Sequence, residues 1–360
     1  MGQTNFKNIL QKEIFEREDI IHLLRAEGAD KNQLFKYASS VKDEYVGNKV
    51  YLRGLIEYSN ICKKDCYYCG IRCSNKDFRR YEISLEDIQD ACNYAIGNKF
   101  ASIVIQSGEL QSNTFTERIT NAIKLIKFLS NGKMRITLSC GEQTPMVYKK
   151  WFEAGAERYL LRIESSNPEL YKKLHPDNWV HSYENRINSL KDLKKAGFQT
   201  GTGVMIGLPF QTIEDLADDI IFMHKSDIDM CGMGPYIEHE NTPLYKYNDL
   251  LLPLDVRYEL TLKMIAILRI VMKDINIAST TALQAINIKG KRTALEIGAN
   301  VIMPNLTPIK YKSEYHLYKN KPGSNLSIEN ELAFSINEIK KANCIPAFGE
   351  YGDAMHFLNR

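Results

Sequence analysis

The sequence predicts an α/β protein built on a (β/α)8 TIM-type barrel. From about residue 50 onward, eight short apolar segments of strand type alternate with amphipathic segments of helix type, the order of elements that builds a parallel sheet. The eight units occupy about 250 residues, the usual length of such a barrel. The strand segments are apolar almost throughout, as expected of parallel strands covered on both faces. A doubly wound open sheet remains the alternative, because alternation alone does not close a barrel.

The first predicted strand, at residues 50–58, leads into a loop, and helix segments separate most of the later strands. Segment 102–106, Ser-Ile-Val-Ile-Gln, is short and rich in β-branched residues, as a buried strand should be. In the helix segments apolar residues recur every three or four positions, and Ser84 with Asp87 is a candidate capping box. The other predicted strands are 134–139, 158–163, 199–205, 228–233, 276–280 and 300–303, and the predicted helices are 85–95, 116–129, 146–154, 183–196, 213–226 and 255–272.

Two terminal segments flank the predicted barrel, which spans residues 48–305. Residues 1–47 form a predicted helical extension, and residues 306–360 form a predicted cap that closes one end of the barrel. The cap segment contains a stretch rich in Lys and Asn, but no internal repeat. Within the two terminal segments, amphipathic periodicity predicts helices at 5–17, 30–41 and 328–342.

The composition excludes several classes of partner. The chain has 47 Lys and Arg against 44 Asp and Glu, a formal net charge of +3, so no strong field draws in nucleic acid or an anionic membrane. No run of about 20 apolar residues is present to span a bilayer, and the N-terminus lacks the apolar region of a secretory signal. We therefore expect a cytoplasmic protein with reduced thiols that binds neither nucleic acid nor membrane.

The most informative motif is C-x3-C-x2-C at Cys62, Cys66 and Cys69, in which Tyr68 precedes the last thiol. A cubane iron–sulfur cluster ordinarily takes four thiolates. Three closely spaced thiolates would leave one iron open to a small molecule, which distinguishes a reactive metal centre from a structural one. A zinc site that adds Cys73 is an alternative, although a second pair of cysteines is missing. Eight cysteines in 360 residues are too sparse for a disulfide scaffold, and we interpret the isolated ones as buried or incidental thiols: Cys92, Cys140, Cys231 and Cys344.

Polar residues follow the predicted strands at the points where those strands end. In a (β/α)8 barrel the active site is built at the carboxyl ends of the strands, so residues far apart in the sequence would meet at one mouth. The cysteine motif follows the first strand and would lie at the same rim. The other polar segments at strand ends are 106–109, 139–142, 162–164, 280–281 and 303–305.

With this cysteine spacing and with Tyr68, the chain resembles the radical S-adenosylmethionine (SAM) enzymes. The resemblance implies a barrel of the radical SAM kind, one 4Fe-4S cluster held by the three motif cysteines, and SAM as cosubstrate. SAM carries a carboxylate that suits an arginine and an ammonium that needs carboxylate or carbonyl acceptors. Gly108-Glu109 resembles the Gly-Glu element that the superfamily places at the SAM amino group. Segment 203–209 is similar to the glycine-spaced strand edge beside the adenine, although a plain strand-to-helix turn would explain it equally well.

The resemblance is closer still to the HydE maturases of FeFe-hydrogenase, and it runs from about residue 45 to residue 318. It implies that Ser139, Glu164 and Arg186 face SAM. A purely structural Glu164–Arg186 pair is the alternative, because buried carboxylates are costly unless they are paired. The segments that carry the resemblance are 57–62, 80–81, 106–109, 158–164, 208–212, 234–243, 280–282 and 300–308.

The HydE resemblance implies an enzyme that cleaves SAM reductively to a 5′-deoxyadenosyl radical and acts in maturation of the FeFe-hydrogenase H-cluster. The implied substrate is a small anionic iron carbonyl–cyanide complex that carries cysteine, and the implied partners are an electron donor such as ferredoxin or flavodoxin and other hydrogenase maturases. Arg162 would offer such an anion a forked donor, unless it forms a salt bridge inside the barrel. The other implied substrate residues are Thr280, Thr281, Met303, Tyr311 and Tyr315, of which the tyrosines could instead only pack the cap.

Two other classes of function stay open. A related radical SAM enzyme would act on an amino-acid-derived substrate, either as a methylornithine synthase, which needs acidic partners for a diamino acid, or as a sulfur inserter like biotin synthase. A non-catalytic iron–sulfur scaffold would bind iron without cleaving SAM. Some HydE proteins carry extra cysteines near the C-terminus for a second cluster. Segment 318–341 has none here, so we expect a single cluster.

Overall fold

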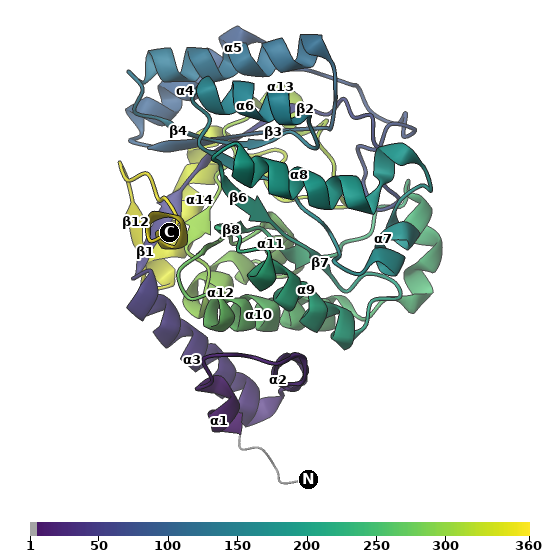
Figure 1. Ribbon diagram of the computed structural model, residues 1–360. Coiled ribbons are helices and arrows are strands. Elements are labelled where there is room, and N and C mark those ends of the chain that lie inside the picture. The colour runs from purple at the N-terminus through teal and green to yellow at the C-terminus, as the bar shows by residue number, and fades with distance from the viewer. Residues whose placement is uncertain (1–5) are drawn as a thin grey trace.

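The computed structural model of the protein describes residues 6–360 (Figure 1). The N-terminal region forms three helices, α1 (Phe6–Leu10), α2 (Arg17–Leu24) and α3 (Gly28–Tyr45). The single helix predicted at 5–17 is wrong beyond α1, because Glu16 and Asp19 form a capping box that starts a new helix; position 5 lies outside the described residues.

Seven strands form one parallel sheet that curls around the core (Figure 1). Along each strand the side chains alternate between the two faces. Val104 and Thr137 line the space inside the curl, whereas Ile103, Ile105 and Ile136 are fully buried in the main hydrophobic cluster. Across the sheet the order is β10 (Asn276–Ile277), β8 (Met230–Cys231), β6 (Gln199–Thr202), β5 (Arg158–Leu160), β4 (Arg135–Ser139), β3 (Ser102–Ser107) and β2 (Gly54–Ser59).

An eighth strand closes the curled sheet into a barrel. β11 (Val301–Ile302) pairs in parallel with β1 (Lys49–Leu52), which continues into β2 after the single residue Arg53. On its other side, Val301 forms a parallel bridge with Ala278, directly after β10. A further parallel bridge joins Leu55 of β2 to Asn305. The predicted (β/α)8 barrel is therefore confirmed, and the open-sheet alternative is wrong.

The helices predicted between the strands are present, with ends shifted by a few residues. Ser84 caps the first of them by accepting a hydrogen bond from the Asp87 backbone N–H at 3.1 Å, although the reciprocal half of the predicted capping box is not formed. None of the helices within residues 6–360 is long and apolar enough to cross a membrane. The helices are α4 (Leu85–Gly97), α5 (Asn113–Leu129), α6 (Pro145–Glu153), α8 (Tyr183–Lys195), α9 (Ile213–Lys225) and α10 (Leu254–Val271).

The structure adds several short elements that periodicity did not predict. The predicted strand at 199–205 is interrupted after Thr202 and resumes as β7 (Met205–Ile206), which pairs in parallel with β9 (Gly234–Pro235) just as β6 pairs with β8. Gly203 lies at this interruption, where a Cβ atom would lie 2.0 Å from the Gly232 carbonyl oxygen. The short helices are α7 (Pro168–Leu174), α11 (Thr281–Ile286), α12 (Gly290–Ile297), α13 (Ile309–Lys312) and α15 (Met355–Leu358), with 3-10 turns at Trp179–His181 and Pro243–Leu250.

The C-terminal segment contacts both ends of the barrel, whereas the sequence predicted that it would cap one end. Residues 306–327 follow β11 and lie over the carboxyl ends of β2 and β3, where Lys321 pairs with Glu57. The chain then forms α14 (Ile328–Lys341), which packs on α12. Finally β12 (Ile345–Ala347) pairs in parallel with β1 at the amino ends of the strands.

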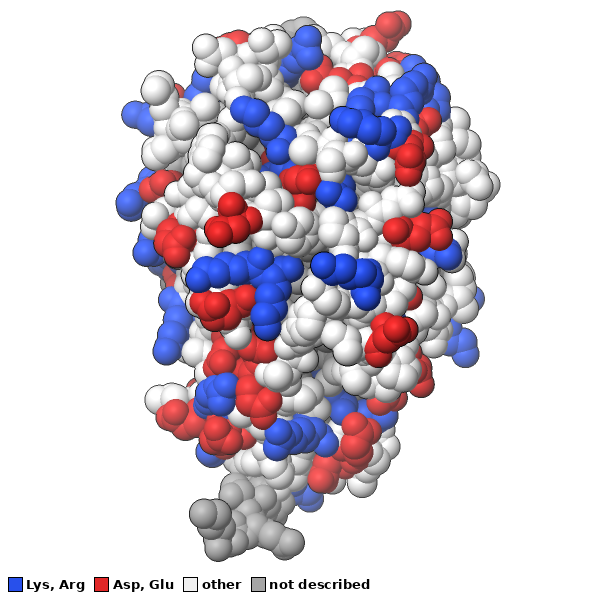
Figure 2. All heavy atoms as spheres, turned by 90° about the vertical axis from the view of Figure 1, so that its right-hand side faces the viewer, with Lys and Arg blue, Asp and Glu red and all other residues white. Residues whose placement is uncertain are grey.

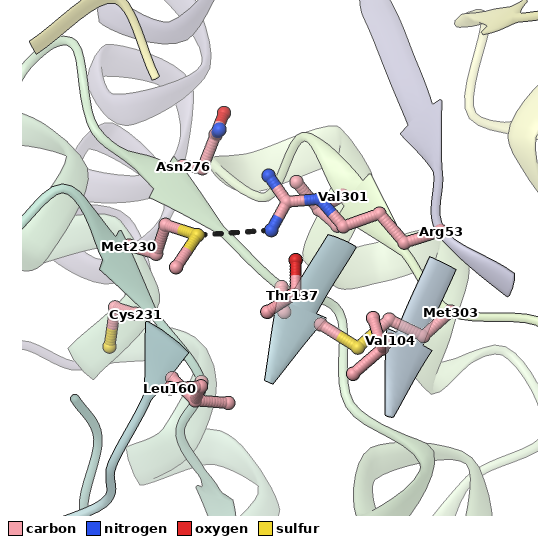
Figure 3. A pocket seen from close by; sticks show the side chains of 11 residues that line it. Arg53, Val104, Thr137, Leu160, Met230, Cys231, Asn276, Val301 and Met303 are labelled. Carbon is pink, nitrogen blue, oxygen red and sulfur yellow. Dashed lines mark hydrogen bonds between the residues drawn. The ribbon is translucent and has the colours of Figure 1, made fainter. Parts of the chain in front are cut away.

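Two buried arginines lie where the C-terminal residues cross the base of the barrel. Arg158 pairs with Asp353 at 2.5 Å (Nη2–Oδ1), whereas Arg53 has no carboxylate partner and donates to the Gly352 carbonyl oxygen and the Met230 sulfur. Figure 3 shows Arg53 projecting into a narrow cavity inside the barrel, with about 20 Å³ of free volume, roughly the space of one water molecule. The barrel interior is thus largely filled at its base, the end formed by the amino ends of the strands. The mouth is the opposite end, formed by their carboxyl ends.

The Arg158–Asp353 ion pair joins the C-terminal segment to the base of the barrel. Breaking it should therefore lower the free energy of unfolding. In Asp353→Asn the side chain keeps its size, but the fully buried Arg158 loses its carboxylate, a change that costs about 3–5 kcal/mol of unfolding free energy. Urea denaturation measures this loss. As a control, Glu153→Gln removes one partner of the exposed Lys149–Glu153 pair and should cost about 0.5 kcal/mol or less. Equal effects of the two substitutions would contradict a structural role for Asp353.

Candidate active site

The three predicted cluster ligands lie on the loop that joins β2 to α4. Arg80 organises this loop, because its guanidinium donates hydrogen bonds of 2.5 to 2.9 Å to the carbonyl oxygens of Asn60, Ile71, Arg72 and Asn75. One side chain thereby fixes several turns of a segment that contains no helix. These hydrogen bonds from Arg80 to backbone carbonyl groups hold the loop in its conformation.

Of the three cysteines on this loop, Cys66 is buried and Cys62 and Cys69 are half-buried. Burial raises the pKa of Cys62 to about 11 and that of Cys69 to about 12, and it raises the pKa of Cys66 as well. A charge on Cys62 would raise the pKa of the other two further. Buried thiols of this kind become thiolates readily only beside a cation, and a metal deprotonates a thiol that coordinates it. The chemistry of these three side chains therefore fits a metal cluster.

Gly108 makes room for the first of these cysteines. A Cβ atom at this position would lie 2.3 Å from the Ile61 carbonyl oxygen and 2.9 Å from the Cβ of Cys62. Next to it, the Glu109 backbone N–H donates to the Cys62 sulfur at 3.3 Å. The Gly108-Glu109 element thus shapes the cysteine loop.

Cys73, the alternative fourth ligand of a zinc site, belongs to the same loop. Its backbone N–H donates to the Lys64 carbonyl oxygen at 2.9 Å, and its half-buried thiol lies near Asp65. Within residues 6–360 no three His, Cys, Asp or Glu side chains are grouped closely enough to hold a single metal ion. A cubane distributes its thiolates over separate iron atoms and does not need so close a grouping.

Arg186 joins two carboxylates in a buried network beside the cysteine loop. Its Nη2 lies 2.8 Å from Glu109 Oε1, and its Nε lies 2.8 Å from Glu142 Oε1. Lys64, which stands between two of the cluster cysteines, approaches Glu142 Oε2 at 3.1 Å. Burial opposes ionisation of Glu109, but the charges of Arg186 and Lys64 lower its pKa to about 2. We call these four residues the Arg186 network; it places one guanidinium and two carboxyl groups next to the cysteine loop.

Glu164 follows β5 and is paired with Arg162, so the Glu164–Arg186 pair considered from the sequence is wrong. Arg162 Nη2 lies 3.0 Å from Glu164 Oε2 and donates to the Val204 carbonyl oxygen at 2.8 Å. Glu164 has φ of +67°, a left-handed conformation that costs a non-glycine residue about 1–3 kcal/mol. Its backbone N–H donates to the Gly203 carbonyl oxygen at 3.1 Å, which helps to hold it there. Burial raises the pKa of Glu164, and the charge of Arg162 opposes this rise.

A second buried ion pair lies at the ends of β2 and β3. Lys321 pairs with Glu57, whose other oxygen accepts a hydrogen bond from Asn305 Nδ2 at 3.1 Å. Lys321 also donates to the Tyr315 carbonyl oxygen at 3.0 Å. The Tyr315 hydroxyl lies 3.4 Å from Gln106 Nε2, and the ring is fully buried near the cluster thiols. Tyr315 is therefore placed at the mouth of the barrel.

The remaining predicted substrate residues do not all lie in one place. Thr280 and Thr281 begin α11 just beyond β10, and the buried Thr280 hydroxyl has no hydrogen-bond partner. Met303 lines the interior cavity (Figure 3). Tyr311 is occupied elsewhere, because its hydroxyl donates to Asp87 Oδ2 at 2.8 Å at the start of α4. We therefore remove Tyr311 from the candidate substrate site.

Ser139, which is predicted to face SAM, and Tyr68 of the cysteine motif complete the rim. Ser139 ends β4, half-buried and in register with Gln106 of β3. The Tyr68 hydroxyl lies 3.2 Å from His175 Nε2. These positions agree with a mouth built from the ends of neighbouring strands.

A recess of about 230 Å³ opens beside the Arg186 network, between the cysteine loop and α8. Glu109 and Glu142 form part of its wall, and the exposed Trp179 stands at its edge. On the side of the molecule at the right of Figure 1, acidic and basic side chains are interspersed (Figure 2). No field of a single sign covers that face.

The part of the chain that builds this site is similar to known proteins. The model of the radical SAM superfamily matches residues 56–223, the part that carries the cysteine loop, the Arg186 network and the Arg162–Glu164 pair. The FeFe-hydrogenase maturase subunit HydE of Thermotoga maritima is 44% identical over 315 residues, which are 87% of this chain and 86% of that protein. The chain belongs to the HydE family of radical SAM enzymes. As such it is a radical SAM enzyme of FeFe-hydrogenase maturation, and the superfamily implies a 4Fe-4S cluster and SAM.

More distant relatives share the architecture of the HydE family. A 3-methylornithine synthase of Methanosarcina acetivorans is 29% identical over 79% of this chain and 78% of its own length. The crystal structure of methylornithine synthase superposes with a TM-score of 0.78 at 24% identity, covering 95% of this chain and 97% of that one. The FeFe-hydrogenase maturase HydG of Carboxydothermus hydrogenoformans gives a TM-score of 0.78 at 20% identity, covering 95% and 79%. At such identities the two structures support the barrel fold alone.

Sequence reasoning missed several residues of this HydE-family site. Lys64 and Glu142 carry half of the charge of the Arg186 network; Glu142 lies in segment 139–142, which was predicted to reach the mouth, but neither residue was assigned a role. Lys64 lies inside the cysteine motif, and Glu142 lies three residues past a strand end, but nothing in the sequence names their partner. Lys321 and His175 stand in segments without any motif.

Proposed function

We propose that this HydE-family enzyme binds one 4Fe-4S cluster through Cys62, Cys66 and Cys69 and holds SAM beside it. The buried Cys66, the half-buried Cys62 and Cys69 on the same loop, and the close approach that Gly108 allows beside Cys62 support this assignment. When bound, a reduced cluster supplies the electron that cleaves SAM to methionine and a 5′-deoxyadenosyl radical, while the protein binds, orients and excludes water.

The Arg186 network supports the placement of the amino-acid end of SAM. A guanidinium suits the SAM carboxylate, and an ionised Glu109 suits the ammonium. In the ligand-free network Arg186 and Glu109 neutralise each other at 2.8 Å. The amino-acid end of SAM brings one charge of each sign, so Arg186 and Glu109 can both exchange partners without being left unpaired. Glu142 and Lys64 remain to hold Arg186 in place.

We further propose that the substrate is a small anionic iron carbonyl–cyanide complex carrying cysteine. Arg162 keeps its Nε without a partner, and Thr280 keeps a buried hydroxyl without one. Donors fixed in a water-poor cavity suit an anion better than a diamino acid. Tyr315 and Thr281 extend the proposed set, with an electron donor of the ferredoxin or flavodoxin type and other hydrogenase maturases as partners.

Arg162→Lys separates substrate binding from SAM cleavage. Lysine retains the charge beside Glu164 but loses the forked donor, and one lost charge-assisted hydrogen bond costs about 1.5–3 kcal/mol. We therefore expect turnover of the iron–cysteine complex to fall roughly 10- to 150-fold, while SAM cleavage without substrate stays within about threefold. Both rates are measured by chromatography of 5′-deoxyadenosine and of product. Arg118→Lys, in the Arg118–Glu82 pair on α5, serves as the matched control.

The same assay tests the rival functions. Consumption of lysine in place of the iron–cysteine complex would favour an amino-acid mutase of the methylornithine synthase type. Iron binding without reductive SAM cleavage by the native protein would favour a scaffold. Either outcome contradicts the proposed substrate.

A further inference from the structure

A buried carboxyl group on α9 contacts the turn that follows Glu164. Asp219 is 0% exposed, and its Oδ1 accepts a hydrogen bond from the Ser166 backbone N–H at 2.7 Å. The other oxygen, Oδ2, has no hydrogen-bond partner among residues 6–360, and burial raises the pKa of Asp219 to about 7. Burying a carboxyl group with one oxygen unpartnered is costly, so its presence here calls for an explanation beyond packing.

The same turn is attached to two neighbouring helices. The hydroxyl of Tyr183, the first residue of α8, donates to the Ser166 carbonyl oxygen at 2.6 Å. Asn167 Nδ2 donates to Asp215 Oδ1 at 2.6 Å. Asp215 lies four residues before Asp219 on α9, so both carboxyl groups lie on one face of that helix. The turn is therefore held between α8 and α9.

Glu164, which lies two residues before Ser166, has a backbone conformation that needs such support. Its left-handed φ of +67° persists in a non-glycine residue only when the surrounding structure determines it. On the strand side, its backbone N–H donates to the Gly203 carbonyl oxygen at 3.1 Å. On the other side, the hydrogen bond from Ser166 to Asp219 fixes the chain two residues later. The backbone is thus held on both sides of Glu164.

We propose that Asp219 is a positioning residue that holds the turn at Ser166 so that Glu164 presents its carboxylate to SAM. Without this acceptor the Ser166 N–H must find another partner, and the turn has to move to reach one. Glu164 would move with it, away from the position in which it lies 3.0 Å from Arg162. The inference rests on the proposed SAM site and on the placement of Glu164 in it.

Two matched variants test this role through SAM binding. Asp219→Ala removes the acceptor of the Ser166 N–H. Asp229 is equally buried and accepts a hydrogen bond from the Thr200 backbone N–H, also at 2.7 Å, but it lies directly before β8 at the base of the barrel. It also pairs with Arg360, so Asp229→Ala should cost at least as much stability in urea denaturation.

Only the variant next to the Glu164 turn should weaken SAM binding. Equilibrium dialysis of radiolabelled SAM with the reconstituted full-length protein, at full cluster content, measures the dissociation constant. We expect it to rise about tenfold in Asp219→Ala, the factor that corresponds to one net hydrogen bond. In Asp229→Ala it should stay within about twofold of the native value, because distant sites act independently.

A conservative variant and a double variant separate positioning from a general loss of stability. Asp219→Asn retains an oxygen that can accept from the Ser166 N–H, so SAM binding should stay within about threefold of the native value. Glu164→Ala should weaken SAM binding by itself. Adding Asp219→Ala to Glu164→Ala should cause little further loss, because both changes act on the same contact.

Four results would overturn the proposal: an unchanged dissociation constant in Asp219→Ala, an equal rise in Asp229→Ala, an equal rise in Asp219→Asn, or a tenfold rise that persists in the Glu164→Ala background. If Asp219→Ala does not fold, Tyr183→Phe removes the other hydrogen bond to Ser166 and should weaken SAM binding about threefold. Unchanged binding in that variant would contradict the proposal as well. A native protein that assembles the cluster but does not bind SAM would instead refute the proposed function, so the two failures are distinguishable.

Discussion

Cys62→Ala is expected to abolish both cluster assembly and reductive cleavage of SAM. Two thiolates do not hold a cubane that already lacks a fourth protein ligand, and SAM then has neither an electron source nor an iron to chelate. The yield of 5′-deoxyadenosine under anaerobic reducing conditions should fall to the level of the protein-free reaction. Absorbance and iron content of the reconstituted variant measure the cluster directly.

Cys73→Ala is the matched control for this prediction. Cys73 lies in the same loop and is half-buried, but we assign it no cluster ligation. This variant should retain about four iron atoms per chain and native SAM cleavage. Loss of the cluster in Cys73→Ala, or full cleavage by Cys62→Ala, would contradict the three-cysteine assignment.

Arg186→Lys is expected to weaken SAM binding by roughly 10- to 100-fold, because a lysine offers no fork for a carboxylate. The lysine preserves one positive charge between the half-buried Glu109 and the buried Glu142, and so it avoids the larger cost of leaving both carboxylates with Lys64 as their only cation. Equilibrium dialysis of radiolabelled SAM with the reconstituted protein measures the dissociation constant.

Arg292→Lys provides the control for Arg186→Lys. Arg292 pairs with the buried Glu338 between α12 and α14, far along the chain from the cysteine loop. SAM binding by this variant should match that of the native protein. An unchanged dissociation constant in Arg186→Lys, at full cluster content, would show that Arg186 does not contact SAM.

The architecture was predictable from the sequence because local patterns determine it. Apolar runs such as 102–106 and the helical periodicity of 213–226 report burial directly, and parallel strand order then places their ends at one rim. The cysteine motif and the Gly108-Glu109 element were found in the same way. Predictions failed where a single local contact decides the chain path, as at the capping box of Glu16 and Asp19, which breaks the first helix.

Pairing between distant side chains was not predictable. Arg186 and Glu164 are both polar residues near the rim, but Arg186 instead meets Glu109 and Glu142 from two other strand ends. Which carboxylate an arginine reaches depends on side-chain geometry that periodicity does not encode. The position of Tyr311 was unpredictable for the same reason, since its hydroxyl donates a hydrogen bond to Asp87 at the start of α4.

Mössbauer spectroscopy of the reconstituted 57Fe protein, before and after addition of SAM, tests the central claim most directly. A three-cysteine cluster with an open corner predicts about four irons per chain, one of which changes its spectrum when SAM is added while the others do not. Four equivalent thiolate-ligated irons whose spectrum does not change when SAM is added would contradict the three-cysteine assignment. Zinc in place of iron would contradict it as well.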